Sequence, residues 1–403
     1  MTGHPADDGG RLRIPVIWNE DCLLHWPDGE VWLGVWETGT EVPERAEVLL
    51  AAARAAGAEV LPAQPHDDAA LESVHDPALV AHLATIWRDW EAGGYVADYG
   101  RRRVVPYVFP TAGLLAGLPP RIPAAVHARP GLFCYDTMTL VGPGSWAAIR
   151  AAADAALTAA DLVAAGRPAA YALCRPPGHH AGPAAYGGSC YLNNAALAAQ
   201  ALRVAGVARV AIIDIDAHHG NGTQAIFYDR GDVSYGSVHV DPGAGWFPHY
   251  AGFADERGTG AGAGANRNLP LAPETGDEAW LAAVGQLCTE AADFGAEGVV
   301  VSLGLDAAAQ DPESPLRVSA DGYRAAGELI GRLGPVVVIQ EGGYDLPSLG
   351  ALAVEALVGI QAGTTGATGA GEGPAGAGSS EEEDRPAGAG PAGPAGAGPA
   401  GGG

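Results

Sequence analysis

Residues 209–222, "RVAIIDIDAHHGNG", decide the fold expected for this chain. An apolar, β-branched run leads directly into two aspartates and two histidines, and a glycine-rich turn follows. Short continuous apolar runs of this kind are typical of parallel strands that are buried on both faces. Burying ionisable side chains is costly unless they are paired or compensated, so the polar end of this strand requires a physical explanation.

Strand and helix patterns alternate through the second half of the chain. Strands are expected at 168–174, 208–216, 232–240, 297–306 and 335–343, and helices at 193–206, 276–295 and 319–334. The first half is less regular, with helices expected at 43–57, 76–93 and 145–166 and a long Arg- and Pro-rich loop at 95–130. This alternation predicts an α/β fold, a single domain in which helices cover both faces of a mostly parallel central sheet.

The two ends of the chain depart from this pattern. Residues 1–12 are expected to be a flexible N-terminus, 13–362 the folded domain, and 363–403 a disordered tail rich in Gly, Ala and Pro. The tail contains no aromatic residue and no Leu, Ile or Val, so it lacks the apolar surface that would offset the entropy of ordering. We recognise no secretory signal and no membrane-spanning helix, and therefore expect a cytoplasmic protein without a membrane partner.

Charge and cysteine content limit the functional classes. The net charge is -25, and only -4 of it lies in 363–403, so the folded part is strongly acidic. Such a surface repels nucleic acid and attracts cations, so we expect no nucleic-acid partner. The five cysteines are scattered without a CxxC pair. This argues against a disulfide framework and leaves His and carboxylate side chains to hold any metal.

Polar side chains gather where the predicted strands end. Five strands are followed by "CRPPGHH" (174–180), "DIDAHHG" (214–220), "SVHVDP" (237–242), "GLDAAAQDP" (304–312) and "EGGY" (341–344). Ligands of open α/β sheets bind in the crevice beyond the carboxyl ends of the strands. This edge of the sheet is therefore the expected functional site.

The end of the strand expected at 208–216 offers ligands for a metal. Asp214, Asp216 and His218 share one face if the chain stays extended. With Asp306, which ends another strand, two carboxylates and one imidazole become available around a cation. Three protein ligands with an open fourth position are typical of catalytic zinc, and oxygen-rich ligation also suits iron(II). A buried Asp–His pair that only steadies a loop is the alternative.

Two further motifs supply groups for proton transfer. His179 and His180, in the rigid "RPPGHH" loop, suit a general base and acid near neutral pH, unless they bind metal or lie on the surface. Asp214 or Asn221 would fix their tautomers. Tyr344 follows a double glycine, where its phenol is placed to donate to an oxyanion, although tyrosine after a glycine turn also serves packing. Together these parts predict metal-assisted hydrolysis of an amide.

Six motifs resemble, in order, those of the histone deacetylase superfamily, which includes bacterial acetylpolyamine amidohydrolases and class II deacetylases. They are "RPPGHHA", "GGSCYLNNAALAAQ", "IDIDAHHGNGTQAIFY", "YGSVHVDP", "VSLGLDAAAQDP" and "QEGGY". The resemblance extends from about Pro43 to Tyr344. It implies the single-domain arginase/deacetylase α/β fold, with 13–362 as the deacetylase catalytic domain, and a zinc-dependent hydrolase that removes acetyl groups from amines.

The resemblance also implies a role for each motif residue. His179 and His180 would transfer protons, and Tyr344 would stabilise the transition state. Asp214 would support the first histidine and Asn221 the second. The ligands implied for Zn²⁺, or Fe²⁺ in the cell, are Asp216, His218 and Asp306. The residues implied for a structural K⁺ site are Asp214, Asp216, His218, Ser237 and Val238, two of them through backbone oxygens.

The acetylpolyamine branch looks most similar, because "GWFPHYAGFADERGTGAGAGANRNLPL" and "VVPYVFP" resemble its loops. In that branch the extra loop helps form a dimer with a narrowed entrance. We therefore expect a homodimer that acts on a small cationic acetylated amine. The alternatives are deacetylation of acyl-lysine in proteins or peptides, hydrolysis of other small amides, and non-catalytic binding of acyl groups. An arginase-like two-metal site is disfavoured, since no further acidic ligand lies beside His218.

Two positions depart from the family pattern. Ser189, in "GGSCY", replaces the usual aromatic residue and removes one wall of the clamp expected around the acyl-carrying chain. Phe247 remains as the other wall, unless Trp246 beside it repacks to take that place, and Gly188 completes the expected substrate-binding set. Gln310 stands where glycine is common and is expected to tighten the loop behind the metal. Neither departure touches a ligand or proton carrier, so the resemblance implies activity with an altered choice of substrate.

Overall fold

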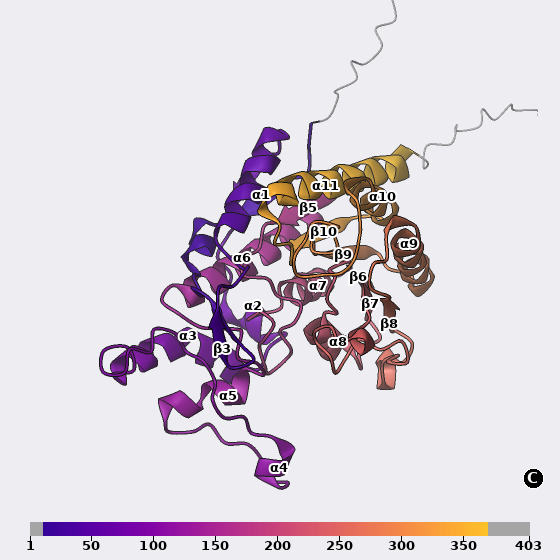
Figure 1. The fold of residues 1–403 in the computed structure, drawn as a ribbon. Coiled ribbons are helices and arrows are strands. Elements are labelled where there is room, and N and C mark those ends of the chain that lie inside the picture. Colours follow the sequence, from indigo (N-terminus) through magenta and orange to yellow (C-terminus); the bar gives the residue numbers. More distant parts are fainter. Residues whose placement is uncertain (1–10, 370–403) are drawn as a thin grey trace, which may run out of the picture.

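An eight-stranded sheet runs through the centre of the computed structural model, which describes residues 11–369 (Figure 1). Every pair of neighbouring strands in this sheet is parallel. In spatial order the strands are β4 (Val60–Pro62), β1 (Val16–Trp18), β5 (Ala169–Ala172), β10 (Val336–Gln340), β9 (Gly298–Leu303), β6 (Val210–Asp214), β7 (Val233–Val240) and β8 (Asn266–Leu271). The prediction of an α/β fold with a mostly parallel central sheet is confirmed.

Helices cover both faces of the sheet, as predicted. Helices α1, α9, α10 and α11 pack on one face, in a core that includes Leu49, Trp280 and Tyr323. Helices α6 and α7 pack on the other face, and α2, α3 and α5 add an outer layer against them. The bounds are α1 (Glu44–Ala55), α2 (Asp68–Glu72), α3 (Pro77–Ala92), α4 (Ala112–Leu115), α5 (Pro130–Phe133), α6 (Ser145–Ala164), α7 (Asn194–Val204), α8 (Asn221–Phe227), α9 (Asp277–Phe294), α10 (Ala320–Gly331) and α11 (Leu346–Gly369). Short 3₁₀ helices lie at Glu20–Leu24, Val126–Ala128, Pro242–Ala244 and Gly260–Gly262.

Burial on both faces explains why the strands are continuously apolar. Along β9, Val299 and Val301 contact the core under α9 and α10, whereas Val300 contacts the core under α6 and α7. This follows from the two-residue period of an extended chain. Each fully buried valine contributes about 1.5–3 kcal/mol relative to exposure, so a charge in the middle of such a strand would be strongly destabilising. The acidic residues that accompany the central strands β6, β9 and β10 accordingly lie at the last position of the strand (Asp214) or beyond it (Asp306, Glu341).

Sequence patterns missed the shortest elements. The edge strand β4 and its neighbour β1 have three residues each, too few to show a period. Strand β8, at the opposite edge, is interrupted by the polar Asn266 and Asn268. A separate antiparallel hairpin, β2 (Glu30–Trp32) and β3 (Val35–Glu37), was also missed.

Both predicted boundaries of the folded domain are displaced. Leu12, expected in the flexible N-terminus, is 1% exposed, and its N–H donates to the carbonyl of Ala56 at 2.9 Å. Helix α11 continues through residues 363–369, which were expected to be disordered. Its glycines explain this difference, because a Cβ atom at Gly359 or Gly363 would clash with the backbone of α10. Residues 1–10 and 370–403 lie outside the described residues.

Helix α11 also bears on the expectation that no segment spans a membrane. By length and composition alone, Leu346–Gly366 meets the criterion for a spanning helix, with a mean hydropathy of 1.4 and half of the window buried. Leu349, Leu357 and Ile360 from this helix lie in the core with α1 and α10. These contacts account for the apolar character of α11 within the domain.

The parallel register aligns the carboxyl ends of the central strands. Asp214, the last residue of β6, is paired with Ser237 of β7 and with Ser302 of β9. Ile339 of β10 is in turn paired with Ser302. The loops that follow these strands therefore leave the sheet at one edge, where ligands of such folds bind.

Candidate active site

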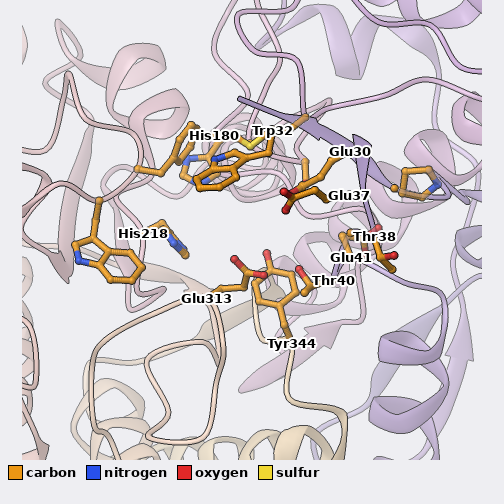
Figure 2. A pocket seen from close by; sticks show the side chains of 18 of the residues that line it. Glu30, Trp32, Glu37, Thr38, Thr40, Glu41, His180, His218, Glu313 and Tyr344 are labelled. Carbon is orange, nitrogen blue, oxygen red and sulfur yellow. The ribbon is translucent and has the colours of Figure 1, made fainter. Parts of the chain in front are cut away.

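A cavity of about 470 Å³ opens at this edge of the sheet (Figure 2). Its inner end is lined by His180, His218 and Tyr344, which come from the loops after three different strands. Its entrance is lined by hairpin β2–β3. Four glutamates also line the cavity, namely Glu30, Glu37, Glu41 and Glu313. Residues predicted to be functional from separate motifs thus surround a single cavity.

Asp216, His218 and Asp306 form a group able to hold a metal ion. One ligand atom from each lies within 4.8 Å of the other two. Nδ1 of His218 is 3.0 Å from Oδ2 of Asp306 and 3.4 Å from Oδ1 of Asp216. Both aspartates are at most 1% exposed. Backbone packs directly against them, because a Cβ atom at Gly304 or Gly342 would lie 2.1 or 2.7 Å from Oδ2 of Asp216.

The sequence predicted that strand alternation brings these residues together, but the structure shows a different cause. Strand β6 ends at Asp214, so Asp216 and His218 lie in the following loop. The N–H of Asp216 donates to Oδ1 of Asp214 at 3.1 Å, and the N–H of His218 donates to Oδ1 of Asp216 at 2.9 Å. Such local side-chain acceptors compete with the strand ladder and turn the chain. The N–H of Ala217 donates to Oδ1 of Asp306 at 2.8 Å, which joins this loop to the one after β9.

The charges of this group fit a cation. Burial, and then the charge of Asp216, raises the pKa of Asp306 to about 7. Burial alone would lower the pKa of His218, but its hydrogen bonds to Asp216 and Asp306 raise it well above its ordinary value. Two buried carboxylates at this separation are costly unless a positive charge lies between them. The donor set therefore fits a divalent cation such as Zn²⁺ or Fe²⁺.

His179 and His180 lie in the loop after β5, each with its Nδ1 proton fixed. Nδ1 of His179 donates to Oδ2 of Asp214 at 3.1 Å, and Nδ1 of His180 donates to Oδ1 of Asn221 at 2.8 Å. The hydroxyl of Tyr235, which sequence reasoning missed, also donates to Oδ2 of Asp214 at 3.0 Å. The two imidazole centroids are 4.1 Å apart. Hydrogen bonding at Nδ1 leaves Nε2 of each ring available for chemistry.

The two histidines have opposite pKa shifts. Burial, and then the imidazoles of His179 and His218, lowers the pKa of His180 well below its ordinary value. Burial opposes protonation of His179 as well, but Asp216 and Asp214 raise its pKa to about 10. Near pH 7 one ring is therefore neutral and the other charged. Neighbouring groups whose pKa values are driven apart are suited to general base and general acid roles.

Tyr344 lies across the cavity from His180 (Figure 2). Its backbone N–H donates to Oδ2 of Asp311 at 2.6 Å. The guanidinium of Arg45 lies 4.7 Å from the centroid of its ring and donates to the carbonyls of Glu341 and Gly343, both at 2.6 Å. Burial raises the pKa of Tyr344 well above its ordinary value, and Arg45 offsets this only in part. The phenol therefore keeps its proton and remains a hydrogen-bond donor.

Glu341 is a buried carboxylate that sequence reasoning missed. Its Oε2 accepts from the N–H groups of Gly178 and His179 at 2.7 and 3.1 Å. One of its oxygens also lies within 4.8 Å of a ring nitrogen of His179 and the sulfur of Cys190. Glu341 thus joins the loop that carries Tyr344 to the loop that carries the histidine pair. An acidic residue directly after the apolar β10 is the same signal that identified Asp214.

Gly188, Ser189 and Phe247 line the cavity, as predicted for substrate contacts. Gly188 has φ +59°, and a Cβ atom there would lie 2.5 Å from the ring of His180 and 3.0 Å from that of Phe247. The rings of His180 and Phe247 are perpendicular, with centroids 4.8 Å apart. Gln310, expected to tighten the loop behind the metal group, is instead exposed.

Of the residues predicted for a potassium site, Asp214, Ser237 and Val238 lie in the adjacent strands β6 and β7, and Asp216 and His218 lie in the loop after β6. Ser237 is paired with Asp214, and Val238 follows in the strand. Nε2 of His239 donates to the carbonyl of Gly252 at 2.8 Å, so its Nδ1 accepts from the Ser237 hydroxyl, also at 2.8 Å. This orientation leaves the oxygen lone pairs of Ser237 available to a cation.

Comparisons with known proteins agree with this geometry. A profile of the histone deacetylase domain matches residues 39–360. Acetylpolyamine amidohydrolase of Mycoplana ramosa is 41% identical over 348 residues, which cover 86% of this chain and 99% of that protein. Acetylpolyamine amidohydrolase 1 of Pseudomonas aeruginosa is 40% identical over 347 residues, which cover 86% and 98%. The crystal structure of acetylpolyamine aminohydrolase from Burkholderia pseudomallei matches with a TM-score of 0.80 at 41% identity, covering 87% of this chain and 99% of that one.

Proposed function

This chain belongs to the histone deacetylase family, in its bacterial acetylpolyamine amidohydrolase branch, and on that premise we propose that it removes acetyl groups from small acetylated amines such as acetylpolyamines. The observation that carries the proposal is the convergence on one cavity of a three-residue metal group, a histidine pair and a tyrosine. Glu30, Glu37 and Glu313, which line the same cavity, support a cationic substrate, whereas the fourth glutamate, Glu41, is paired with Arg45 and Arg175.

Asp216, His218 and Asp306 would hold the catalytic Zn²⁺, or Fe²⁺ in the cell. Such an ion supplies a Lewis acid that polarises the acyl carbonyl and lowers the pKa of water. Asp214, Asp216, His218, Ser237 and Val238 would hold a structural K⁺ ion. Two neighbouring buried aspartates would then have positive charge on both sides, which offsets the cost of burying them.

The histidine pair would move the protons of the reaction. His180 is neutral, and its Nε2 accepts the proton of the attacking water while Asn221 holds the Nδ1 proton in place. His179, whose Nδ1 is held by Asp214, would donate a proton to the leaving amine. The amide C–N bond breaks as that proton arrives, so acetate and a free amine leave the site.

Tyr344 would stabilise the oxyanion formed when water attacks the acyl carbon. Its phenol keeps its proton and faces the cavity opposite His180. Arg45 and Asp311 hold the loop that positions it. A preorganised donor of this kind acts mainly in the transition state, where charge on the oxygen has developed.

We further propose that the chain acts as a homodimer through the long loop at 95–130. Several apolar side chains of this loop are at least 60% exposed, which is unusual for a surface without a partner. They are Tyr99, Tyr107, Leu114, Leu118 and Ile122. Light scattering on the purified protein is expected to give twice the mass of one chain, and a monomer at micromolar concentration would contradict the proposal.

Acetate release tests the proposed function. Purified, zinc-loaded protein is expected to release acetate from N-acetylputrescine, and a chelator is expected to stop the reaction until zinc is restored. Asp306→Asn is expected to lower zinc content and acetate release together, because it removes one charged ligand. The protein is also tested after supplementation with zinc, iron and potassium. If it binds metal stoichiometrically and still releases no acetate, the proposal is contradicted.

A further inference from the structure

A second group of metal-ligating side chains lies directly behind the wall of the cavity. One ligand atom each of His179, Cys190 and Glu341 lies within 4.8 Å of the other two, and we call these residues the Cys190 group. Their exposed fractions are 3%, 0% and 0%. Within residues 11–369, one other group of three such side chains could hold a metal ion, namely the catalytic metal group of Asp216, His218 and Asp306. The proposed function explains the catalytic metal group but not the Cys190 group.

Backbone contacts hold the Cys190 group in place. Oε2 of Glu341 accepts from the N–H groups of Gly178 and His179 at 2.7 and 3.1 Å. Cys190 forms two backbone hydrogen bonds with Gly187, at 3.0 and 3.1 Å. Ligand atoms that are fixed in this way need little reorganisation to bind an ion.

Glu341 has one carboxylate oxygen that the fold hardly uses. Oε2 is committed to the two backbone N–H groups, whereas the bond to Oε1 is a long one of 3.4 Å from the Ser302 hydroxyl. A carboxylate oxygen has two lone pairs, so Oε1 is open to a further partner. The thiol of Cys190 lies on this side of the histidine pair, and a cation shared between them would satisfy both groups.

His179 connects the Cys190 group to the reaction. Its Nδ1 donates to Asp214, so the lone pair that the ring can offer to a metal is on Nε2. This is the nitrogen from which the leaving amine would receive its proton. Nε2 is 3.7 Å from Oδ1 of Asp216, so the Cys190 group adjoins the catalytic metal group. An ion bound to Nε2 would therefore stop proton transfer while leaving the catalytic ligands in place.

The donor atoms of the two groups differ in kind. The Cys190 group offers sulfur, imidazole and carboxylate, whereas the catalytic metal group offers two carboxylates and one imidazole. Thiolates favour soft metal ions, and carboxylates favour harder ones. An ion can approach from the cavity, whose wall includes His180 and Ser189, the neighbours in sequence of His179 and Cys190.

We propose that the Cys190 group is a second, inhibitory metal site, which binds a thiophilic divalent cation, Cd²⁺ or excess Zn²⁺, and blocks turnover by taking Nε2 of His179. On binding, the thiol releases its proton to water, and the thiolate and Glu341 together balance the charge of the ion. Metal binding at this site is independent of the reaction, and only the inhibition rests on the proposed function. The same metal would then act in opposite ways at two adjoining sites.

Metal binding is tested first without turnover. Cd²⁺ is added to zinc-loaded protein, and unbound metal is removed by desalting. The protein is expected to retain one zinc and one cadmium ion per chain and to show the ultraviolet charge-transfer absorption of a Cd–thiolate bond. Cys190→Ser is expected to lose this absorption and the cadmium but to keep the zinc. Cys288→Ser, which removes a buried thiol from α9 instead, is expected to behave as the wild type.

Glu341→Gln is a second variant, in which the thiol is intact. Its amide oxygen can still accept from the N–H groups of Gly178 and His179, but the charged ligand is lost. The Kd for Cd²⁺ is expected to rise about tenfold. This variant tests the site even if Cys190→Ser does not fold.

Inhibition is tested by steady-state acetate release from N-acetylputrescine. One equivalent of Cd²⁺ is expected to lower kcat of the wild type about tenfold or more, because it removes the proton donor of the leaving amine. Cys190→Ser is expected to have the wild-type rate without Cd²⁺ and to need at least about ten times more Cd²⁺ for the same loss. Excess Zn²⁺ is expected to distinguish the two proteins in the same way.

The outcomes separate this inference from the proposed function. If Cd²⁺ replaces the zinc without thiolate absorption, or inhibits Cys190→Ser as strongly as the wild type, the second site is wrong and the function stands. Thiolate absorption from Cys190 with unchanged turnover would overturn the inhibitory role. If the wild type releases no acetate yet binds Cd²⁺ through Cys190, the proposed function fails and the metal site stands.

Discussion

Behind the inner end of the cavity, Asp216, Asp306 and His179 are 0–3% exposed, whereas at the entrance Trp32 and Trp36 are about half exposed. The inner residues are fixed by hydrogen bonds to backbone N–H groups and by glycines that leave no space for a side chain. The entrance residues belong to a short hairpin, which is held by a few hydrogen bonds to one turn. The difference separates the chemistry, which tolerates little change, from the choice of substrate, which can vary without disturbing the fold.

Removing the phenol at the inner end is expected to have the largest effect. Tyr344→Phe should lower kcat by about 100-fold or more, because it deletes a donor used mainly in the transition state. Zinc content and the midpoint of thermal unfolding should stay close to those of the wild type. Steady-state acetate release checks this, with Tyr250→Phe, 93% exposed, as the matched control. Turnover near the wild-type value would remove Tyr344 from the mechanism.

Two variants of Glu341 test whether its hydrogen bonds or its negative charge keep the residues at the inner end of the cavity in position. Glu341→Ala leaves the N–H groups of Gly178 and His179 buried without an acceptor, at a cost of about 1–3 kcal/mol, and is expected to lower kcat about tenfold or more with little change in KM. Glu341→Gln retains an oxygen that can accept both bonds, so most of the activity should return. Equal losses in the two variants would show that the charge, not the position, matters.

The ratio of two affinities, measured as a function of pH, reports on the charge at the entrance. Burial, then Glu313, Asp136 and Glu37, raises the pKa of Glu30 to about 7, so Glu30 is largely neutral at pH 6 and charged at pH 8. The amine of the ligand stays charged over this range. The ratio of the Kd values of N-butylacetamide and N-acetylputrescine should therefore rise about threefold or more from pH 6 to 8.

In Glu30→Gln the same ratio should be nearly independent of pH. Because both ligands occupy the same cavity, titration of the histidines affects both affinities and cancels in the ratio. A ratio that rises equally in the variant and the wild type would assign the pH dependence to another group and contradict the role of Glu30.

The smallest effect is expected at Ser189. Ser189→Phe should improve kcat/KM on acetyl-lysine-type substrates about threefold by restoring the missing wall. The φ of Ser189 is 61°, which is unfavourable for an aromatic residue, so the variant should also lose on the order of 1 kcal/mol of stability. Parallel measurement of kcat/KM and of unfolding by denaturant checks both. Unchanged or lower kcat/KM would mean that Trp32 already fills this space.

Sequence reasoning predicted the inner end well for a physical reason. Asp214, Asp306 and Tyr344 follow strands that are buried on both faces, and polar groups at such positions have few explanations other than a shared site. It failed locally where side chains redirect the backbone, as Asp214 and Asp216 do when they end strand β6.

The remaining errors concern features that exist only once the chain has folded. Glu30 and Glu37 become a pair through the register of a hairpin with three residues in each strand, and neither has a signal of its own in the sequence. Gly359 and Gly363 resemble the glycine-rich tail in composition, yet in α11 they allow close contact with α10. Sequence periodicity cannot predict either feature, because each depends on the segment that packs against these residues in the folded chain.

We propose that this chain deacetylates small cationic amines and not acyl-lysine in proteins. The most direct test is the ratio of kcat/KM for N-acetylputrescine to that for an acetyl-lysine peptide, measured side by side on zinc-loaded wild-type protein with a chelator control. We expect the diamine to be preferred by about 100-fold or more, from its charge at the entrance and the restricted cavity. A preference for the peptide would contradict the claim and assign the chain to protein deacetylation.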